Sequence, residues 1–142
     1  MDRRVLHTQH DVEVWCAFLK KATLPMVVGW KKGDEEITRQ NRTAFMWYAE
    51  ISAELGDQTP TEVRANCNLN LGVPIRREVY EDFLSEYDQI VRPLPYEHKL
   101  KLMVEPFDFP VTREFTVPQM TRYLDAIQRE FAHVRLTMPE AA

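Results

Sequence analysis

Residues 38–55 read TRQNRTAFMWYAEISAEL, a polar start followed by an apolar pattern that predicts a long helix. Apolar side chains recur there at spacings of three and four residues, so they share one helix face. That face comprises Ala44, Phe45, Tyr48, Ile51 and Leu55. Gly56 follows, and glycine is strongly favoured just beyond a helix end. The segment therefore predicts a helix with one buried face that stops at Gly56.

The head of this helix concentrates polar groups, from Thr38 to Arg42. Two guanidiniums and two side-chain amides lie at the positive end of a helix dipole, where free N–H groups favour phosphate. Arginine adds planar, paired contacts to phosphate oxygens. Ordinary solvated helix starts carry the same residue types. The head is therefore a candidate site for phosphates and base edges, with a plain solvated helix start as the alternative.

Two short segments ahead of this helix predict β-strands. They cover residues 4–7 and 26–30, and the second is opened by Pro25 and contains two adjacent valines. Between them, residues 9–21 have a helical pattern. Its inner face is expected to hold Val12, Trp15, Cys16 and Leu19. Strand, helix and strand at this spacing indicate a compact α/β unit.

Further helices are predicted after Gly56, at about 59–71, 78–90, 96–103 and 116–131. Thr59 and Thr116 each begin a capping box, in which a threonine is followed three residues later by Glu or Gln. Gly72 is interpreted as the stop of the first of these helices. We therefore expect an α+β fold with several helices packed on a small sheet, in a single domain over residues 1–142.

Composition indicates an ordinary globular chain of 142 residues, 44% hydrophobic and 28% charged. No apolar run approaches the roughly 20 residues of a membrane span, and no signal-peptide core follows the start, so we expect a cytoplasmic protein. Cys16 and Cys67 lie in apolar helical patterns, which predicts two buried thiols rather than a disulfide or metal site. The net charge is −4, but residues 1–77 carry eleven basic and ten acidic side chains. Such an asymmetric charge distribution can still hold a polyanion on one face of the protein.

Motifs for catalysis are missing from the sequence, which has no GxSxG, HExxH or phosphate-loop pattern. Glu97 and Lys99 have the E-x-K spacing of a class of metal-dependent nucleases, with Asp88 as an upstream carboxylate. The pattern around them is helical, and residues two apart on a helix do not face each other. We expect no catalytic residues, no metal and no cofactor. A nuclease centred on Glu97 and Lys99 is the enzymatic alternative.

The order of motifs resembles the NinB, or Orf, family of phage recombination accessory proteins. The Pro25 strand is followed by Arg39-Gln40-Asn41-Arg42 at the helix start, with Phe45 three residues further on. Ile51-Ser52 lies later in the same helix, and Val111-Thr112-Arg113 precedes the last capped helix. The resemblance spans most of the chain and is weakest in its middle.

The resemblance implies a homodimeric α+β protein that binds single-stranded DNA and assists loading of a recombinase or annealing protein. It also implies the host single-strand-binding protein as a partner. Gln40 and Arg113 would line the DNA-binding surface. The flanking residues would be Arg39, Asn41, Arg42 and Thr112, with Phe45 as the matching aromatic. Two helix starts distant in sequence would then converge on one strand of phosphates.

A protein-interaction module without DNA binding is the alternative from a different class. Its docking element would be the acidic stretch 78–88, which holds five carboxylates and would face a basic partner. Steep dependence of DNA affinity on salt separates the two hypotheses, because only phosphate contacts release counterions.

Overall fold

The computed structural model describes residues 4–30, 33 and 35–139, and over these ranges the regular structure is entirely helical. No strand occurs in the described residues, so the expected α+β fold with a small sheet is wrong. The two predicted strands, 4–7 and 26–30, are irregular segments. Their composition suits a strand, but a strand also needs a neighbour to complete its backbone hydrogen bonds. The described part of the chain supplies no such neighbour.

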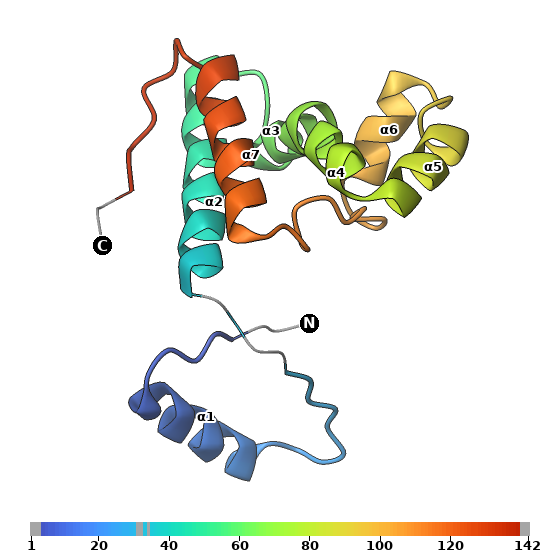
Figure 1. Ribbon diagram of the computed structural model, residues 1–142. Coiled ribbons are helices and arrows are strands. Elements are labelled where there is room, and N and C mark those ends of the chain that lie inside the picture. The colour runs from blue at the N-terminus through green and yellow to red at the C-terminus, as the bar shows by residue number, and fades with distance from the viewer. Residues whose placement is uncertain (1–3, 31–32, 34, 140–142) are drawn as a thin grey trace.

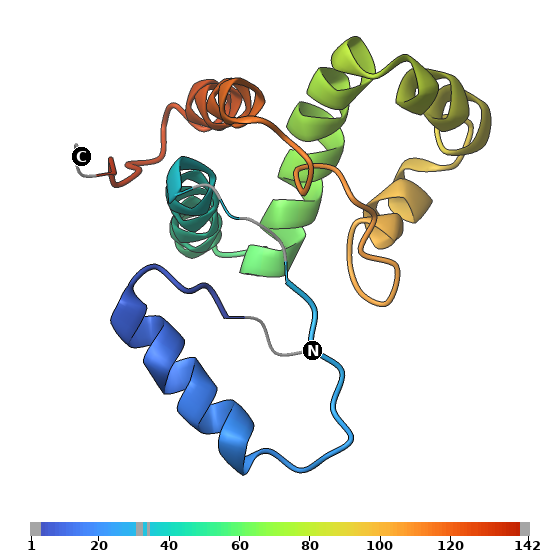
Figure 2. The same ribbon diagram turned by 60° about the horizontal axis from the view of Figure 1, so that its bottom comes forward.

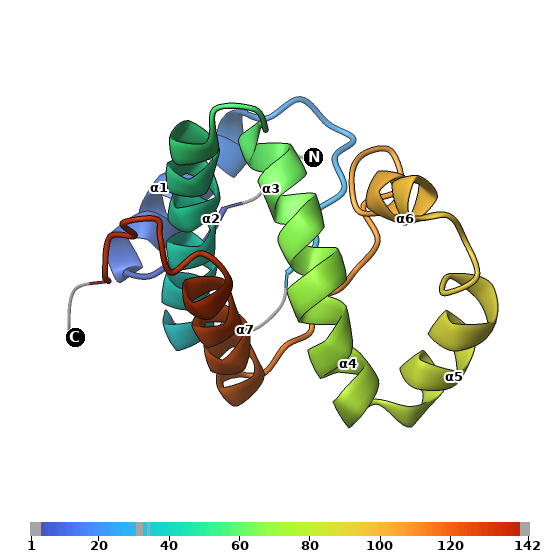
Figure 3. The ribbon, with the colours of Figure 1, turned by 90° about the horizontal axis from the view of Figure 1, so that it is seen from above.

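Two helices packed side by side form the centre of the fold, namely α2 (Glu35–Leu55) and α7 (Val117–Glu130). Both begin at the same end of the molecule (Figure 1). A third helical run packs against them and is built from α3 (Pro60–Cys67), the π-helical turn η1 (Asn68–Gly72) and α4 (Val73–Val79). Figure 3 shows this run extending past α2 and α7 without interruption.

The helix ends predicted from capping residues and glycine are confirmed at two of these helices. Leu55 ends α2, and Gly56 follows with a φ of 77°, the left-handed conformation that glycine adopts without strain. Thr116 caps α7 by accepting a hydrogen bond from the backbone N–H of Gln119, whose side chain accepts in return from the Thr116 N–H. Local sequence therefore determines where these helices begin and end.

The predicted helix stop at Gly72 is wrong, because the backbone passes through this residue in helical conformation, with a φ of −81°. Gly72 is buried, and a Cβ there would lie 2.7 Å from Val111 Cγ1 and 3.4 Å from Tyr123 Cε1. The absence of a side chain lets the helical run approach α7 closely. Glycine serves here for packing rather than for ending a helix.

Two short helices extend the fold beyond α4. They are α5 (Glu81–Ile90), which packs on α4, and α6 (Tyr96–Leu102), which contacts α3. The helix expected over 78–90 is broken at Tyr80, whose ψ of 107° is extended. Arg77 on α4 donates hydrogen bonds of 2.9 and 2.8 Å to Asp88 on α5. This pairing lowers the pKa of the Asp88 carboxyl and fixes the angle between the two helices.

The hydrophobic core fills the space between α2, α7 and the helical run α3–η1–α4. Its most deeply buried members include Ile51, Val63, Cys67, Met103, Met120, Tyr123 and Ile127. Burial raises the pKa of the Cys67 thiol to about 12, so this cysteine stays protonated at neutral pH.

The first helix, α1 (Gln9–Lys21), lies to one side of this helical body (Figure 2). Its boundaries agree with the prediction, and Val12, Trp15 and Leu19 of the expected inner face are half-buried. None of its residues is fully buried, however, and Cys16 is exposed, so the expectation of a buried thiol there is wrong. Val27 is 100% exposed and Trp30 90% exposed in the segment that follows. We call residues 4–30 the N-terminal arm. None of the helices in the described ranges is long and apolar enough to cross a lipid bilayer.

Candidate nucleic-acid interface

Gln40 fastens the start of α2 to the start of α7. Its Nε2 donates to the Val117 carbonyl oxygen at 3.2 Å and to the Thr121 hydroxyl at 2.9 Å. The side chain is only 6% exposed, and its Oε1 accepts no hydrogen bond from the described residues. Gln40 therefore lies between the helices and acts by holding their first turns together, rather than by presenting its amide at the surface.

Thr112 and Arg113 lie in the loop that leads into α7. The Thr112 carbonyl oxygen accepts from the Phe115 N–H at 3.1 Å, which forms a tight turn just before the Thr116 cap. Thr112 is half-buried, whereas Arg113 is exposed. Two helix starts that are more than seventy residues apart in sequence thus meet, with Gln40 as the physical link between them.

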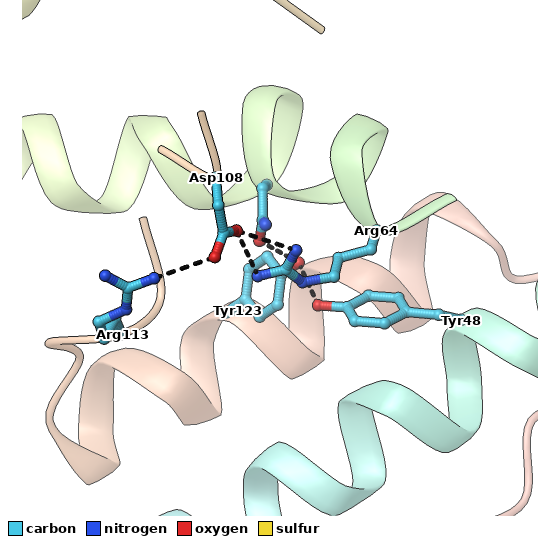
Figure 4. A network of polar contacts seen from close by, with 6 residues as sticks. Tyr48, Arg64, Asp108, Arg113 and Tyr123 are labelled. Carbon is cyan, nitrogen blue, oxygen red and sulfur yellow. Dashed lines mark hydrogen bonds and ion pairs between the residues drawn. The ribbon is translucent and has the colours of Figure 1, made fainter. Parts of the chain in front are cut away.

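Arg113 is connected to α3 through a shared carboxylate (Figure 4). Its guanidinium donates to Asp108 Oδ2 at 3.1 Å, while Arg64 on α3 contacts Asp108 Oδ1 at 3.4 Å through both terminal nitrogens. The sequence predictions included neither Arg64 nor Asp108. No spacing rule links them, because they are 44 residues apart and only the tertiary fold brings them together.

Phe45 is 59% exposed, which corrects the expectation that it lies on the buried face of its helix. One side of its ring is covered by the Arg64 guanidinium at 5.8 Å, and its edge meets Tyr48 at 5.6 Å between ring centroids. The buried aromatic of this helix is instead Trp47, which is 2% exposed and donates to the Thr137 carbonyl at 2.7 Å. Phe45 therefore offers an accessible aromatic surface beside a cation.

The remaining polar residues at the head of α2 face solvent. Arg39 pairs with Glu36 at 3.4 Å, one helical turn earlier. Asn41 and Arg42 are exposed, and Arg42 makes no ion pair with any residue in the described ranges. Arg42 precedes Phe45 by three residues, so the two side chains lie on the same side of the helix. A guanidinium without an ion pair among the described residues is therefore on the side of α2 that carries the exposed ring.

Together these side chains form what we call the cationic corner, comprising Arg42, Phe45, Arg64, Asp108 and Arg113. It combines three guanidiniums, one carboxylate and one exposed aromatic ring, drawn from α2, α3 and the loop before α7. A positive surface beside an aromatic face suits a single-stranded nucleic acid, whose phosphates and unstacked bases need these two kinds of contact.

A buried tyrosine pair lies beneath the cationic corner and joins α2, α7 and η1 (Figure 4). The hydroxyls of Tyr48 and Tyr123 are 2.7 Å apart, and Tyr123 donates to Asn68 Oδ1 at 3.1 Å. Because Tyr123 has one hydroxyl proton, Tyr48 acts as the donor between the two rings. Burial raises the pKa of both phenols, so they remain neutral. The buried polar groups beneath the cationic corner thus have hydrogen-bond partners.

The residues on which the nuclease and protein-interaction hypotheses depend lie outside the cationic corner. Glu97 and Lys99 are on α6, as their helical pattern predicts. Among the described residues, no group of three or more His, Cys, Asp or Glu side chains is placed to hold a metal ion. In the acidic stretch, Asp88 is paired with Arg77 and Arg92. That pairing leaves less of the stretch's charge available to a partner.

Comparison with protein-family models, with curated proteins and with solved structures finds no match.

Proposed function

We propose that this protein is a phage recombination accessory protein that binds single-stranded DNA at the cationic corner. In this role it assists the loading of a recombinase or annealing protein in the host cytoplasm, with the host single-strand-binding protein as a partner. The observation that carries the proposal is the contact between the start of α2 and the start of α7, where Gln40 donates to Val117 and Thr121, a few residues after Thr112-Arg113. Sequence resemblance singled out the Arg39–Arg42 and Thr112-Arg113 segments, and the link from Gln40 to the first turns of α7 supports their acting together.

The chemistry of the corner matches an unpaired strand better than a duplex. Arg42 and Arg113 are exposed and can each contact a phosphate, whereas Phe45 can stack on a base that is free of its complement. Such stacking contributes about 1–3 kcal/mol per base, and it tolerates any sequence because every base has a flat face. The affinity would therefore depend on whether the DNA is single-stranded or double-stranded, and on salt concentration, more than on base sequence.

The N-terminal arm supports a homodimer as part of this proposal. Nine of the sixteen large hydrophobic side chains that are exposed in the described residues belong to the arm. Its segment 26–30 has strand-forming composition but no strand partner among the described residues of its own chain. The same segment of a second copy is self-complementary by symmetry and would satisfy both the backbone and the apolar side chains.

Fluorescence anisotropy with a dye-labelled oligonucleotide tests the DNA-binding proposal. Charge reversal in Arg42→Glu and in Arg113→Glu should each weaken single-strand binding by about tenfold or more, because a phosphate contact becomes a repulsion. The matched control is Arg129→Glu, since Arg129 lies in the last turn of α7, at the far end from the corner. Affinities of Arg42→Glu and Arg113→Glu equal to that of the control would refute the proposal.

A protein-interaction module remains the second candidate, and one observation favours it. Glu81, Asp82 and Glu86 are exposed on α5 and form no ion pair within the described ranges. These three carboxylates could dock a basic protein surface. This candidate predicts no salt-dependent affinity for single-stranded DNA, so the anisotropy measurement on the wild-type protein separates the two.

A further inference from the structure

We propose that Arg64 and Arg113 form an anion-binding subsite, and that Asp108 is a built-in competitor that occupies it until a phosphate displaces the carboxylate. This inference rests on the proposed DNA-binding function for its biological meaning. The subsite itself rests on the geometry of these three side chains, and it adds Arg64 and Asp108 to the residues that control binding.

The two guanidiniums approach a single carboxylate from opposite sides. Asp108 Oδ2 is 3.1 Å from the Arg113 guanidinium, and Asp108 Oδ1 is 3.4 Å from both terminal nitrogens of Arg64. Paired arginines hold a phosphate through the same charge-assisted contacts to two oxygens. The carboxylate therefore stands where two oxygens of a phosphate would stand. With Asp108 in place, the pair of arginines has half of its positive charge cancelled.

The subsite is open enough for an incoming strand to reach. The side chains of Arg64, Asp108 and Arg113 are 28%, 39% and 55% exposed. Arg64 also covers the ring of Phe45 at 5.8 Å, so a phosphate bound by Arg64 would lie close to the ring on which a base can stack. A nucleotide carries both a phosphate and a base, so it can make these two contacts together.

The loop holds Asp108 firmly in this position. Its backbone N–H donates to the Val104 carbonyl at 2.9 Å, and the Phe109 N–H donates to the Leu102 carbonyl at 2.8 Å. Asp108 has a φ of 45°, a left-handed conformation that side-chain-bearing residues adopt uncommonly and that aspartate tolerates better than most. The backbone of Asp108 is thus fixed by the loop, so displacement of the carboxylate by a phosphate requires only rotation of the side chain.

Competition from the Asp108 carboxylate should change how the affinity for single-stranded DNA depends on salt concentration. In the wild-type protein, a phosphate entering the subsite displaces an internal carboxylate, whereas in Asp108→Asn it neutralises an unopposed positive charge. The variant should therefore bind single-stranded DNA about tenfold more tightly at low salt. Its plot of log affinity against log salt should be steeper by about 0.7, the value for one additional phosphate contact on a single strand.

Two probes test the inference, namely labelled single-stranded DNA by anisotropy and inorganic tripolyphosphate by thermal shift. Asp108→Asn should show the tighter DNA binding, and tripolyphosphate should raise its Tm by more than it raises that of the wild type. The matched control is Glu114→Gln, which removes one negative charge from the same loop, where Glu114 lies 3.8 Å from Arg76. Adding Arg64→Gln to Asp108→Asn should abolish the gain with both probes.

The outcomes separate this inference from the proposed function. If Asp108→Asn behaves like Glu114→Gln with both probes while the wild type binds DNA, the competitor role is wrong and the DNA-binding proposal stands. If no variant binds DNA, the proposed function fails, and the tripolyphosphate response alone decides whether the subsite exists. Asp108→Gly provides a second variant that suits the φ of 45°, so loss of the carboxylate can be tested without strain in the loop.

Discussion

The buried hydroxyl of Tyr123 forms two hydrogen bonds with residues that are distant from it in the sequence. Its hydroxyl accepts from Tyr48 on α2 and donates to Asn68 in η1, so one side chain joins three helical elements. The hydrophobic pattern of α7 places Tyr123 beside the apolar stripe, but its two partners come from other parts of the sequence. A single buried residue therefore links the helices that support the cationic corner.

Removing one hydroxyl from this network should have unequal effects. Tyr123→Phe leaves the Tyr48 proton and the Asn68 oxygen without partners, which should lower the free energy of unfolding by about 1–3 kcal/mol. Tyr48→Phe leaves the bond from Tyr123 to Asn68 intact, so its cost should be smaller, about 0.5–1.5 kcal/mol. Urea denaturation of both variants measures the difference. An equal loss, or a larger loss for Tyr48→Phe, would contradict the hydrogen-bond assignment.

Helices and their ends were largely predictable, because capping is decided by neighbouring residues. Thr116 and Gln119 fix the start of α7, and Gly56 ends α2, as predicted. The two predicted strands failed for the opposite reason, since strand formation depends on a partner that lies elsewhere. Gly72 also misled the sequence interpretation, because a glycine at a helix end and one at a close helix crossing look alike in sequence.

The close crossing at Gly72 gives a test at the level of the element. Gly72→Ala places a Cβ 2.7 Å from the buried Val111 side chain, so overpacking should destabilise the fold by about 1–3 kcal/mol even though alanine favours helix. Gly33→Ala serves as the control, because no atom lies within 4 Å of a Cβ built there, and it should stay within about 0.5 kcal/mol of wild type. Equal thermal stability of the two variants would show that Gly72 is not closely packed against Val111 and Tyr123.

The molecule as a whole consists of a helical body and an arm that leaves its apolar side chains exposed. The sequence singled out Arg39–Arg42 at the start of α2 and Thr112-Arg113, and Gln40 links the first segment to the start of α7, just after the second. It did not predict Arg64 or Asp108, because their pairing depends on how α3 meets a loop far along the chain. It placed Phe45 in the core, because periodicity does not show which edge of a helix face remains uncovered.

If two copies of the protein assemble through the N-terminal arm, a charge introduced into the arm should change the oligomeric state. Val27 is 100% exposed in the single chain, so Val27→Asp should leave the helical circular dichroism unchanged. It should convert a dimer into a monomer in analytical ultracentrifugation, because the charge would be buried between two copies. Val79→Asp alters another exposed valine, on the helical body, and should remain a dimer. A monomeric wild type, or an unaltered dimer in Val27→Asp, would rule out the arm as the interface.

The central claim is that two helix starts distant in sequence form one cationic surface for an unpaired strand of DNA. The most direct measurement is single-strand affinity over a salt series for wild type, Arg42→Gln, Arg113→Gln and the double variant. We predict a steep salt dependence whose slope falls by about 0.7 for each arginine removed, with both losses present in the double variant. A wild-type protein whose affinity is independent of salt, or slopes that both substitutions leave unchanged, would contradict the claim.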